Sequence, residues 1–338
     1  MPVHFLNNTV SGPQNLAGPD SLLVDPLAEI NGGGATALNL TSGPWTITVK
    51  GNVHSSGDEA IVLADAGAFV STMTIGKDAT IATTALNRAA IATLHATNIK
   101  NAGHIQSING TAGIDEIGNG DFRIENVKGG VIQGITGIFI ESSGTHAVIN
   151  AGKIDAPTAI SSLAGIEKVK NSGSLLGDVN LGAGNDSFTN FIKINHIVKS
   201  GKVTGEISGE AGNDVLKGGS LGDVLVGGLD KDTLTGGGAL DKFVFNSAVE
   251  SAVGANRDVI TDFNHLQHDK IDLHNIDADT GTGLDQAFHF IGAKSFHGVA
   301  GELRYAGHLL RGDVDGNGTA DFEIHVNAAH LVKGDFIL

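Results

Sequence analysis

The chain has 338 residues, including 49 Gly and no Cys, and its 21 Lys and Arg against 37 Asp and Glu give a net charge of −16. The absence of Cys excludes disulfides, zinc–thiolate sites and thiol catalysis, and the acidic charge argues against nucleic acid or anionic membranes as partners. No run of about 18 apolar residues occurs, so we expect no membrane span. An acidic, Gly-rich chain instead favours binding of a hard cation such as Ca²⁺.

The N-terminal segment is expected to cap the fold. It begins MPVHFLNNTVSGPQNLAGPD, without the basic and apolar regions of a Sec-type signal, so we expect no cleaved signal peptide. We assign residues 1–44 to an N-terminal cap segment.

Residues 45–208 predict a right-handed parallel β-helix. Short β-branched runs alternate with Gly and Asn, and one Asn recurs at spacings of 25, 24 and 21 residues, as Asn101, Asn126, Asn150 and Asn171. That period, with three short strands in each repeat, is typical of a β-helix coil. At the turns Asn tolerates the left-handed conformation, and stacked Asn side chains can form ladders.

Five nonapeptides follow a second pattern, with one copy at 181–189 inside the β-helix range and four consecutive copies in 209–244. Each copy has Asp at its sixth position and a large apolar residue at its eighth, namely Phe188, Leu216, Leu225, Leu234 and Phe243. This is the pattern of RTX nonapeptides, which form a Ca²⁺-binding parallel β-roll. We therefore predict an all-β chain in which the β-helix continues into a roll at 209–245, followed by a β-rich C-terminal cap.

The nonapeptide loops supply the predicted ligands for several Ca²⁺ ions. Carboxylate and backbone carbonyl oxygens suit this hard cation, and Gly lets the carbonyls turn inward. We expect loops on alternating sides of the roll, with an ion between repeats i and i+2. The predicted metal ligands are Asp186, Asp214, Asp223, Asp232 and Asp241, together with the loop residues Gly184, Gly209, Ala211, Gly212, Gly218, Ser220, Gly227 and Leu229.

Three of these loops depart from the pattern at their fourth position, where Leu221, Asp230 and Ala239 replace Gly. A side chain at a position that favours Gly changes the allowed backbone conformations. The sequence therefore leaves the geometry of these loops open.

The C-terminal region resembles a known family. Its matching segments are Phe243–Ser247, Asp258–Phe263, Asp269–Leu273 and Asp335–Leu338. On these motifs, residues 209–338 resemble the RTX and secretion domain of the serralysin family of secreted metalloproteases. The resemblance implies that 246–338 is a C-terminal cap and type I secretion domain. It also implies bacterial export by a type I ABC transporter through an uncleaved C-terminal signal, with Ca²⁺-driven folding outside the cell.

The sequence lacks the catalytic motif of that family. Its zinc site needs His-Glu-x-x-His, and no His-Glu pair occurs in this chain. We therefore do not expect a zinc protease.

Two further groups are candidate metal sites. Asp313, Asp315, Asn317 and Asp321 occupy positions 1, 3, 5 and 9 of an EF-hand-type loop, but position 12 is Ile324 instead of the bidentate Glu. The loop is either a weak Ca²⁺ site or an Asx-rich hairpin turn. Separately, three histidines, His265, His268 and His274, could bind a transition metal, although their spacing matches no standard site.

Three functions remain open. We favour a secreted, non-enzymatic Ca²⁺-binding solenoid acting at a surface, in a matrix or on a host, with an extracellular polysaccharide or a cell surface as candidate partner. The alternative is a β-helix lyase or epimerase acting on uronic-acid polymers, for which the acidic cluster Asp115, Glu116, Asp121 and Glu125 could supply acid–base groups. Such a run on a loop is more often a solvated face or an accessory cation site than a catalytic group. A pore-forming toxin ranks last.

Overall fold

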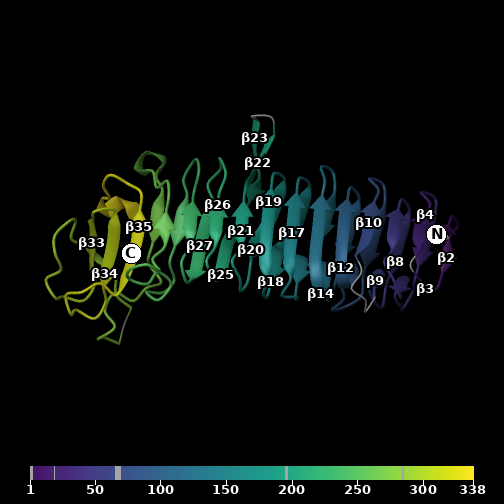
Figure 1. The fold of residues 1–338 in the computed structure, drawn as a ribbon, viewed down its shortest axis with the longest axis horizontal. Coiled ribbons are helices and arrows are strands. Elements are labelled where there is room, and N and C mark those ends of the chain that lie inside the picture. The colour runs from purple at the N-terminus through teal and green to yellow at the C-terminus, as the bar shows by residue number, and fades with distance from the viewer. Residues whose placement is uncertain (1–2, 19, 65–69, 195–196, 284) are drawn as a thin grey trace. The chain divides into compact units, whose positions relative to one another are not determined.

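The computed structural model describes residues 3–18, 20–64, 70–194, 197–283 and 285–338, and its strands are drawn as arrows in Figure 1. The chain divides into two compact units. Unit 1 comprises residues 1–182 and 191–205, and unit 2 comprises residues 183–190 and 206–338. The predicted all-β solenoid class is confirmed. Among the described residues, the helices are two 3₁₀ segments of three residues each, and neither is long enough to cross a membrane.

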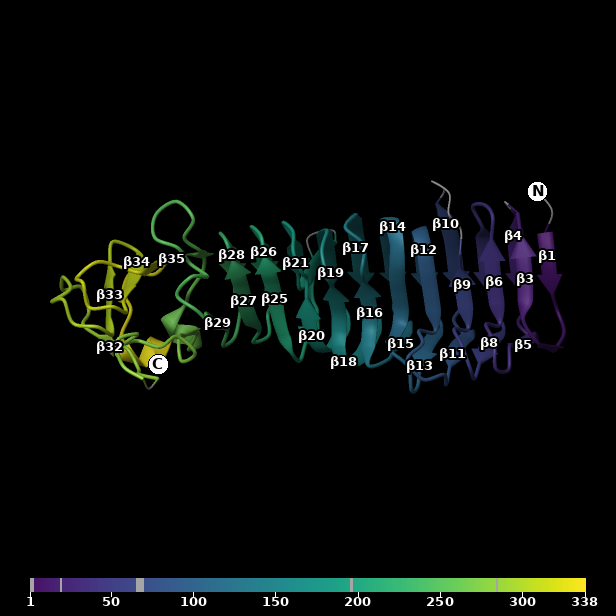
Figure 2. The same cartoon turned by 90° about the horizontal axis from the view of Figure 1, so that it is seen from below.

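Unit 1 is a parallel coil with three faces, seen edge-on as stacked arrows in Figure 2. The first face contains β1 (Val3–Leu6), β4 (Ser21–Val24), β7 (Thr46–Val49), β10 (Ser71–Ile75), the ends of β12 (Ile91–Asn101) and β14 (Ala112–Asn126), β17 (Thr145–Asn150) and β19 (Ile166–Asn171). The second face contains β2 (Val10–Ser11), β5 (Glu29–Asn31), β8 (Asn52–Ser55), β11 (Thr80–Thr83), β13 (His104–Ser107), β15 (Val131–Gln133), the starts of β18 (Lys153–Ser162) and β20 (Ser174–Asn180), and β24 (Lys202–Val203). The third face contains β3 (Gln14–Ala17), β6 (Leu38–Thr41), β9 (Ile61–Leu63), the starts of β12 and β14, β16 (Thr136–Ile140) and the ends of β18 and β20. An antiparallel hairpin, β22 (Phe191–Ile194) with β23 (Ile197–Ser200), projects from the coil.

The interior of unit 1 is a set of apolar columns. Parallel pairing in register places the same strand position of each coil directly above the last, and alternate residues of each strand point inward. One such column on the first face consists of buried Ile47, Met73, Ile99, Ile124, Val148 and Val169.

An asparagine ladder runs along one corner of unit 1. Asn101 Nδ2 donates to Asn126 Oδ1 at 2.9 Å, and the same bond joins Asn126 to Asn150 and Asn150 to Asn171 at 2.8 Å each. All four side chains are fully buried. The predicted ladder is confirmed, whereas the left-handed conformation is not adopted at any of the four.

Unit 2 begins as a flattened parallel roll with two faces. One face contains β21 (Ser187–Thr189), β26 (Val215–Lys217), β28 (Thr233–Thr235), β30 (Val259–Ile260) and β35 (Phe322–Val326). The other contains β25 (Glu206–Ala211), β27 (Val224–Leu229), β29 (Lys242–Val244), β31 (Lys270–Asp272) and β36 (Phe336–Ile337). The eighth-position apolar residues of all five nonapeptides are fully buried between these faces.

The roll ends in a small cap. There β32 (His289–Phe290) pairs with β33 (Glu302–Ala306), which runs antiparallel to β34 (Leu309–Asp313), and β34 runs antiparallel to β35. The 3₁₀ segments η1 (His265–Gln267) and η2 (Lys333–Asp335) belong to the same region. The expected β-rich cap is therefore built around strands that also complete the roll.

The predicted boundaries differ from these units in two places. Residues 1–44, expected as a cap, contain β1–β6, which pair in parallel with the following coils. Their alternating buried residues, such as Leu22 and Val24, supply the inward-facing pattern that the intervening turns obscure in the sequence. The nonapeptide at 181–189, expected inside the β-helix, contributes β21 to unit 2 through its pairing with β26.

Candidate metal centre

The sixth-position aspartates stack into a ladder along one edge of the roll. The backbone N–H of Asp186 donates to Asp214 Oδ1 at 2.7 Å, that of Asp214 to Asp232 Oδ1 at 2.8 Å, and that of Asp232 to Asp258 Oδ1 at 2.8 Å. Each carboxylate therefore ties its own loop to the loop one rung earlier. All four residues are buried.

A second ladder belongs to the loops that lead into the other face. The N–H of Asp223 donates to Asp241 Oδ1 at 2.8 Å, and that of Asp241 donates to Asp269 Oδ1 at 3.0 Å. Asn190 Nδ2 begins this ladder by donating to Asp223 Oδ1 at 3.0 Å. Successive nonapeptides thus contribute to alternate edges, as the repeat length predicts.

The remaining carboxylate oxygens of these ladders are the unusual feature of unit 2. Oδ2 of Asp214, Asp232, Asp241 and Asp258 is buried and accepts no hydrogen bond from the described residues. Asp223 differs, because its Oδ2 accepts the N–H of Gly219 at 2.9 Å. A buried carboxylate oxygen without a donor is costly, since neither water nor protein stabilises its charge.

The first-position glycines make room for these oxygens. A Cβ added to Gly209 would lie 2.2 Å from Asp214 Oδ2, one added to Gly227 would lie 2.3 Å from Asp232 Oδ2, and one added to Gly236 would lie 2.5 Å from the Oδ2 of the next aspartate. Gly at this position therefore leaves an oxygen-lined cradle between backbone and carboxylate.

Electrostatics in the ladders favour a bound positive charge. Burial, together with the charges of neighbouring carboxylates, raises the pKa of Asp214, Asp232 and Asp241 to about 7 and that of Asp258 to about 8. Burial and like-charge proximity both disfavour the ionised form. A cation with oxygen ligands reverses both effects, so the donor set fits Ca²⁺.

The predicted carbonyl ligands lie in the same loops. Ala211 O accepts the N–H of Gly184 at 2.8 Å, and Leu229 O accepts the N–H of Gly212 at 3.1 Å. Each carbonyl has two lone pairs and so keeps acceptor capacity. Gly218, whose N–H donates to Thr235 O at 2.8 Å, opens the loop that also contains Ser220.

The irregular fourth positions behave differently from one another. Asp230 and Ala239 adopt φ of 77° and 71°, so they keep the positive φ that Gly184 and Gly212 have in their copies, at smaller angles. Leu221 does not adopt a positive φ. Its loop instead closes through the hydrogen bond from Gly219 N–H to Asp223 Oδ2. Of the three replacements of Gly, the one at Leu221 therefore alters its loop, whereas those at Asp230 and Ala239 keep the positive φ.

The EF-hand-type loop is well organised. Asp313, fully buried, accepts the N–H groups of Gly316 and Gly318 at 2.8 Å each, and Asp321 Oδ2 accepts the N–H of Val314 at 2.7 Å. Ligand atoms of Asp313, Asp315 and Asp321 lie within 4.8 Å of one another, the one group of three or more His, Cys, Asp or Glu found to converge in this way among the described residues.

Two other members of this loop behave differently. Asn317 caps a turn by donating to Asp315 and accepting from Thr319. Ile324, at the twelfth position, is buried in β35 and supplies no ligand. Both expected interpretations, the turn and the cation site, remain compatible with this geometry.

The three candidate histidines do not converge. His265 Nδ1 lies 2.5 Å from Asp335 Oδ1, and His274 Nδ1 lies 2.5 Å from Asp272 Oδ1. His268 has φ 67° and ends η1. Each is explained by a separate structural contact.

The acidic cluster of β14 is likewise divided. Glu116 points into the coil and is fully buried, whereas Asp115 is half-buried on the opposite side of the strand. Asp121 accepts the N–H of Thr145 at 3.0 Å, and Glu125 lies further along the same strand. The structure does not bring the four carboxylates together.

The ladders also contain two candidate ligands that the nonapeptide pattern did not predict. Asp258 and Asp269 continue the two ladders beyond the last nonapeptide. Their signal was present, because Asp258-x-Ile260 and Asp269-x-Ile271 repeat the spacing between the sixth-position Asp and the eighth-position apolar residue. The Gly-rich half of the repeat is absent there, which concealed it.

Comparison with known proteins agrees with this geometry. The family model described as peptidase M10 serralysin C terminal matches residues 170–338, half of the chain. No curated protein matches the chain significantly.

Proposed function

Because the chain belongs to the family described as peptidase M10 serralysin C terminal, we propose that it is a secreted Ca²⁺-binding solenoid protein that folds outside the cell. The observation that carries the proposal is the set of buried Oδ2 atoms, on Asp214, Asp232, Asp241 and Asp258, without a hydrogen-bond donor. Asp186 and Asp223 complete the carboxylate ladders, and the carbonyls of Gly209, Ala211, Gly227 and Leu229 are the further proposed ligands.

Folding of the roll is proposed to depend on the ion. Stacking brings the carboxylates of successive rungs together in a buried edge, where they repel one another. Bound Ca²⁺ supplies the positive charge that offsets this repulsion. Extracellular modules bind Ca²⁺ with dissociation constants of roughly 10⁻⁴–10⁻³ M, so cytosolic levels leave the roll unfolded. Ligand binding to the folded state alone then becomes folding free energy.

The burial of Asp335 and Phe336 in folded unit 2 fits a role of Asp335–Leu338 as a signal for export by a type I ABC transporter before folding. In folded unit 2, Asp335 is buried against His265, and Phe336 is paired with Ile271 and packed on Phe290. A receptor can therefore reach Asp335 and Phe336 only in the unfolded chain, whereas Ile337 and Leu338 are half-buried in the folded unit. Ca²⁺-free cytosol would keep the signal exposed, and extracellular Ca²⁺ would bury it.

We favour a non-enzymatic role at a cell surface, in a matrix or on a host. Acid–base catalysis on a polymer requires carboxylates that reach the substrate. Glu116 is enclosed in the coil, and Asp121 is committed to a backbone bond. This arrangement supports the binding role over a lyase or epimerase acting on uronic-acid polymers.

A Ca²⁺ titration followed by circular dichroism tests the calcium proposal. Asp232→Ala and Asp258→Ala each remove one carboxylate from the same ladder, so each should raise the Ca²⁺ midpoint for β-structure about tenfold, equivalent to ~1.4 kcal/mol. Asp78→Ala, which removes the same charge from an exposed position in unit 1, is the control and should leave the midpoint unchanged. Unchanged midpoints in both ladder variants would refute the site.

Secretion assays test the export signal. Deleting Asp335–Leu338 should abolish export through a type I apparatus, and the chain should accumulate inside the cell. The replacement Asp335→Asn with Phe336→Ala should reduce export while leaving the chain length unchanged. Normal secretion of the deletion variant would remove the signal from these residues.

A further inference from the structure

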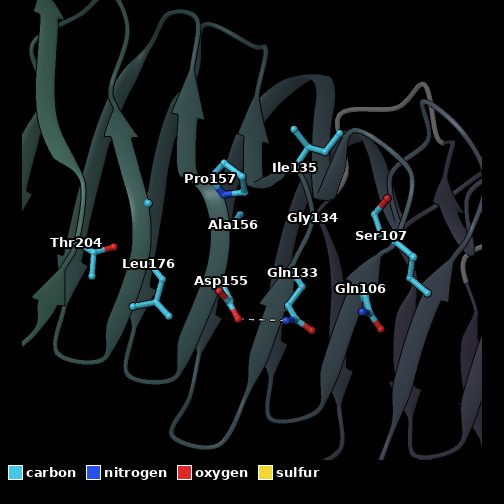
Figure 3. Close-up of a pocket in the computed structure, with 12 residues that line it drawn as sticks. Gln106, Ser107, Gln133, Gly134, Ile135, Asp155, Ala156, Pro157, Leu176 and Thr204 are labelled. Carbon is cyan, nitrogen blue, oxygen red and sulfur yellow. Dashed lines mark hydrogen bonds between the residues drawn. The ribbon is translucent and has the colours of Figure 1, made fainter.

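An open groove crosses the second face of unit 1. It measures about 540 Å³ and is shown in Figure 3, where its lining side chains form two rows on successive strands. The first row is set by register, because Gln106 pairs with Gln133, Gln133 with Asp155, and Asp155 with Leu176. Thr204 lies at the end of this row, and its backbone N–H donates to Leu175 O. With strands ~4.8 Å apart, the five rungs extend for ~19 Å.

The second row is an apolar ridge at the neighbouring corner. Ile108 and Ile135 are 53% and 60% exposed, and Pro157 beside them is also exposed. Ile135 and Pro157 come from successive coils and lie above the polar row in Figure 3, and Ile108 lines the same groove. The groove is therefore amphipathic across its width over its first three rungs, where a polar and an apolar side chain recur together.

The polar row is organised by hydrogen bonds between coils. His104 Nε2 lies 2.6 Å from Gln133 Oε1, Gln133 Nε2 donates to Asp155 Oδ2 at 3.2 Å, and Lys153 Nζ donates to the same oxygen at 2.6 Å. The bond from Lys153, assisted by that from Gln133, lowers the pKa of Asp155, which is thus ionised at neutral pH. Asp155 is the one titratable residue among the described groove-lining residues, so the groove holds no second carboxylate for acid–base chemistry.

These features restrict the occupant. The strands beneath the groove pair on both sides, β15 with β13 and β18, and β18 with β15 and β20, so a peptide cannot add as a further strand. A polyphosphate needs several Lys or Arg residues, and the lining has none. A polyuronate would place its carboxylates beside ionised Asp155. A neutral polymer with many hydroxyl groups meets none of these objections.

We propose that this groove binds an uncharged polysaccharide lying along the coil axis. The amide of Gln106 donates to and accepts from hydroxyls, and Gln133 keeps a second N–H and a second lone pair for this beside its bonds to Asp155 and His104. The ridge of Ile108, Ile135 and Pro157 covers the C–H faces of the sugar rings. Because a polar and an apolar side chain recur together over three successive rungs, a polymer gains contacts that a single sugar lacks. The lining has no aromatic platform, so binding to each sugar unit is weak and affinity grows with polymer length.

Affinity electrophoresis of the full chain in Ca²⁺ tests the proposal. The gels contain laminarin, dextran, galactomannan or alginate as probes. We expect at least one neutral polymer to retard the protein and alginate to leave it unretarded. Gln106→Ala and Ile135→Ala should each weaken retardation about threefold or more. Leu163→Ala, which truncates an apolar side chain of matched exposure (57%) away from the groove, should not change it.

Three results would overturn the groove assignment: no retardation by any neutral polymer, preferential retardation by alginate, or full retardation of both groove variants. The same variants should keep the wild-type Ca²⁺ midpoint in circular dichroism, since the groove lies wholly in unit 1. A failure of the polysaccharide proposal is thereby distinguished from a failure of the calcium proposal.

Discussion

At the scale of single residues, the ladder aspartates divide their two oxygens between two tasks. In Asp232, Oδ1 accepts the N–H of Asp214 and fixes the spacing between rungs, while Oδ2 faces the cradle above Gly227 without a donor. The Cβ of an alanine at position 227 would clash with Asp232 Oδ2. Gly is therefore required here because the carboxylate lies close to the backbone, and not because of a left-handed φ. The same residue therefore serves the fold and the proposed ion.

Asp115 offers a pH-dependent test in unit 1, away from the ladders. Burial, followed by the charges of Glu141 and Glu116, raises the pKa of Asp115 to about 7. The folded chain thus holds a proton that the unfolded chain has released, so the stability that this group contributes falls as pH rises from about 4 through 7. Asp115→Asn should consequently stabilise unit 1 by ~1–2 kcal/mol at pH 8 and by much less at pH 4.

Hydrogen exchange of the β12 and β14 amides at both pH values would measure this difference. Asp78→Asn, at an exposed position, is the control and should change stability by less than ~0.5 kcal/mol at either pH. An Asp115→Asn effect that does not vary with pH would contradict the assignment.

At the scale of elements, unit 1 and unit 2 join their rungs with different side chains. In unit 1 neutral Asn side chains bond to one another across the ends of β12, β14, β17 and β19. In unit 2 the Oδ1 atoms of the ladder carboxylates accept backbone N–H groups, and the Oδ2 atoms of several of them have no hydrogen-bond donor among the described residues. The neutral ladder is satisfied by the chain itself, which is why it needs no ion.

Asn126 is the best position for testing the neutral ladder. It accepts from Asn101 and donates to Asn150 and to two backbone carbonyls, all at a buried corner. Asn126→Ala leaves buried polar groups unpaired and should lower the free energy of unfolding of unit 1 by ~3 kcal/mol in urea denaturation. Asn109→Ala, which removes an exposed amide bonded to Thr84 O, should cost less than ~1 kcal/mol. Equal losses in the two variants would argue against the ladder as a stabilising element.

At the scale of the whole molecule, the two units should respond differently to removal of Ca²⁺. Unit 1 is held by apolar columns and by the Asn ladder, whereas unit 2 brings buried carboxylates together. In excess EGTA we expect amides of β25–β31 to lose hydrogen-exchange protection, while those of β7–β19 keep it. Mg²⁺ should not restore protection, because it is smaller and demands near-octahedral geometry. Equal protection of both units in EGTA would contradict calcium-dependent folding of the roll.

The spacing of residues along the sequence predicted part of this architecture. The Asn repeat identified the buried ladder, and the nonapeptide identified which Asp and which apolar residues face inward. Residues 1–44 were assigned to a cap segment because short strands separated by Pro and Gly turns carry little periodicity. Asp258 and Asp269 were missed because the Gly-rich half of the repeat does not precede them, although their Asp-x-Ile spacing matches the nonapeptides.

The sequence by itself determined the repeating part of this protein, since a solenoid places residues that share a repeat position at the same place on successive coils. It therefore established the β-solenoid, the sixth-position aspartates and the Asn ladder. Only the tertiary structure decided which carboxylate oxygens remain without donors, how far each ladder extends, and that Gln106, Gln133 and Asp155 line one groove opposite an apolar ridge. These depend on burial and on contacts between coils, which local spacing does not encode.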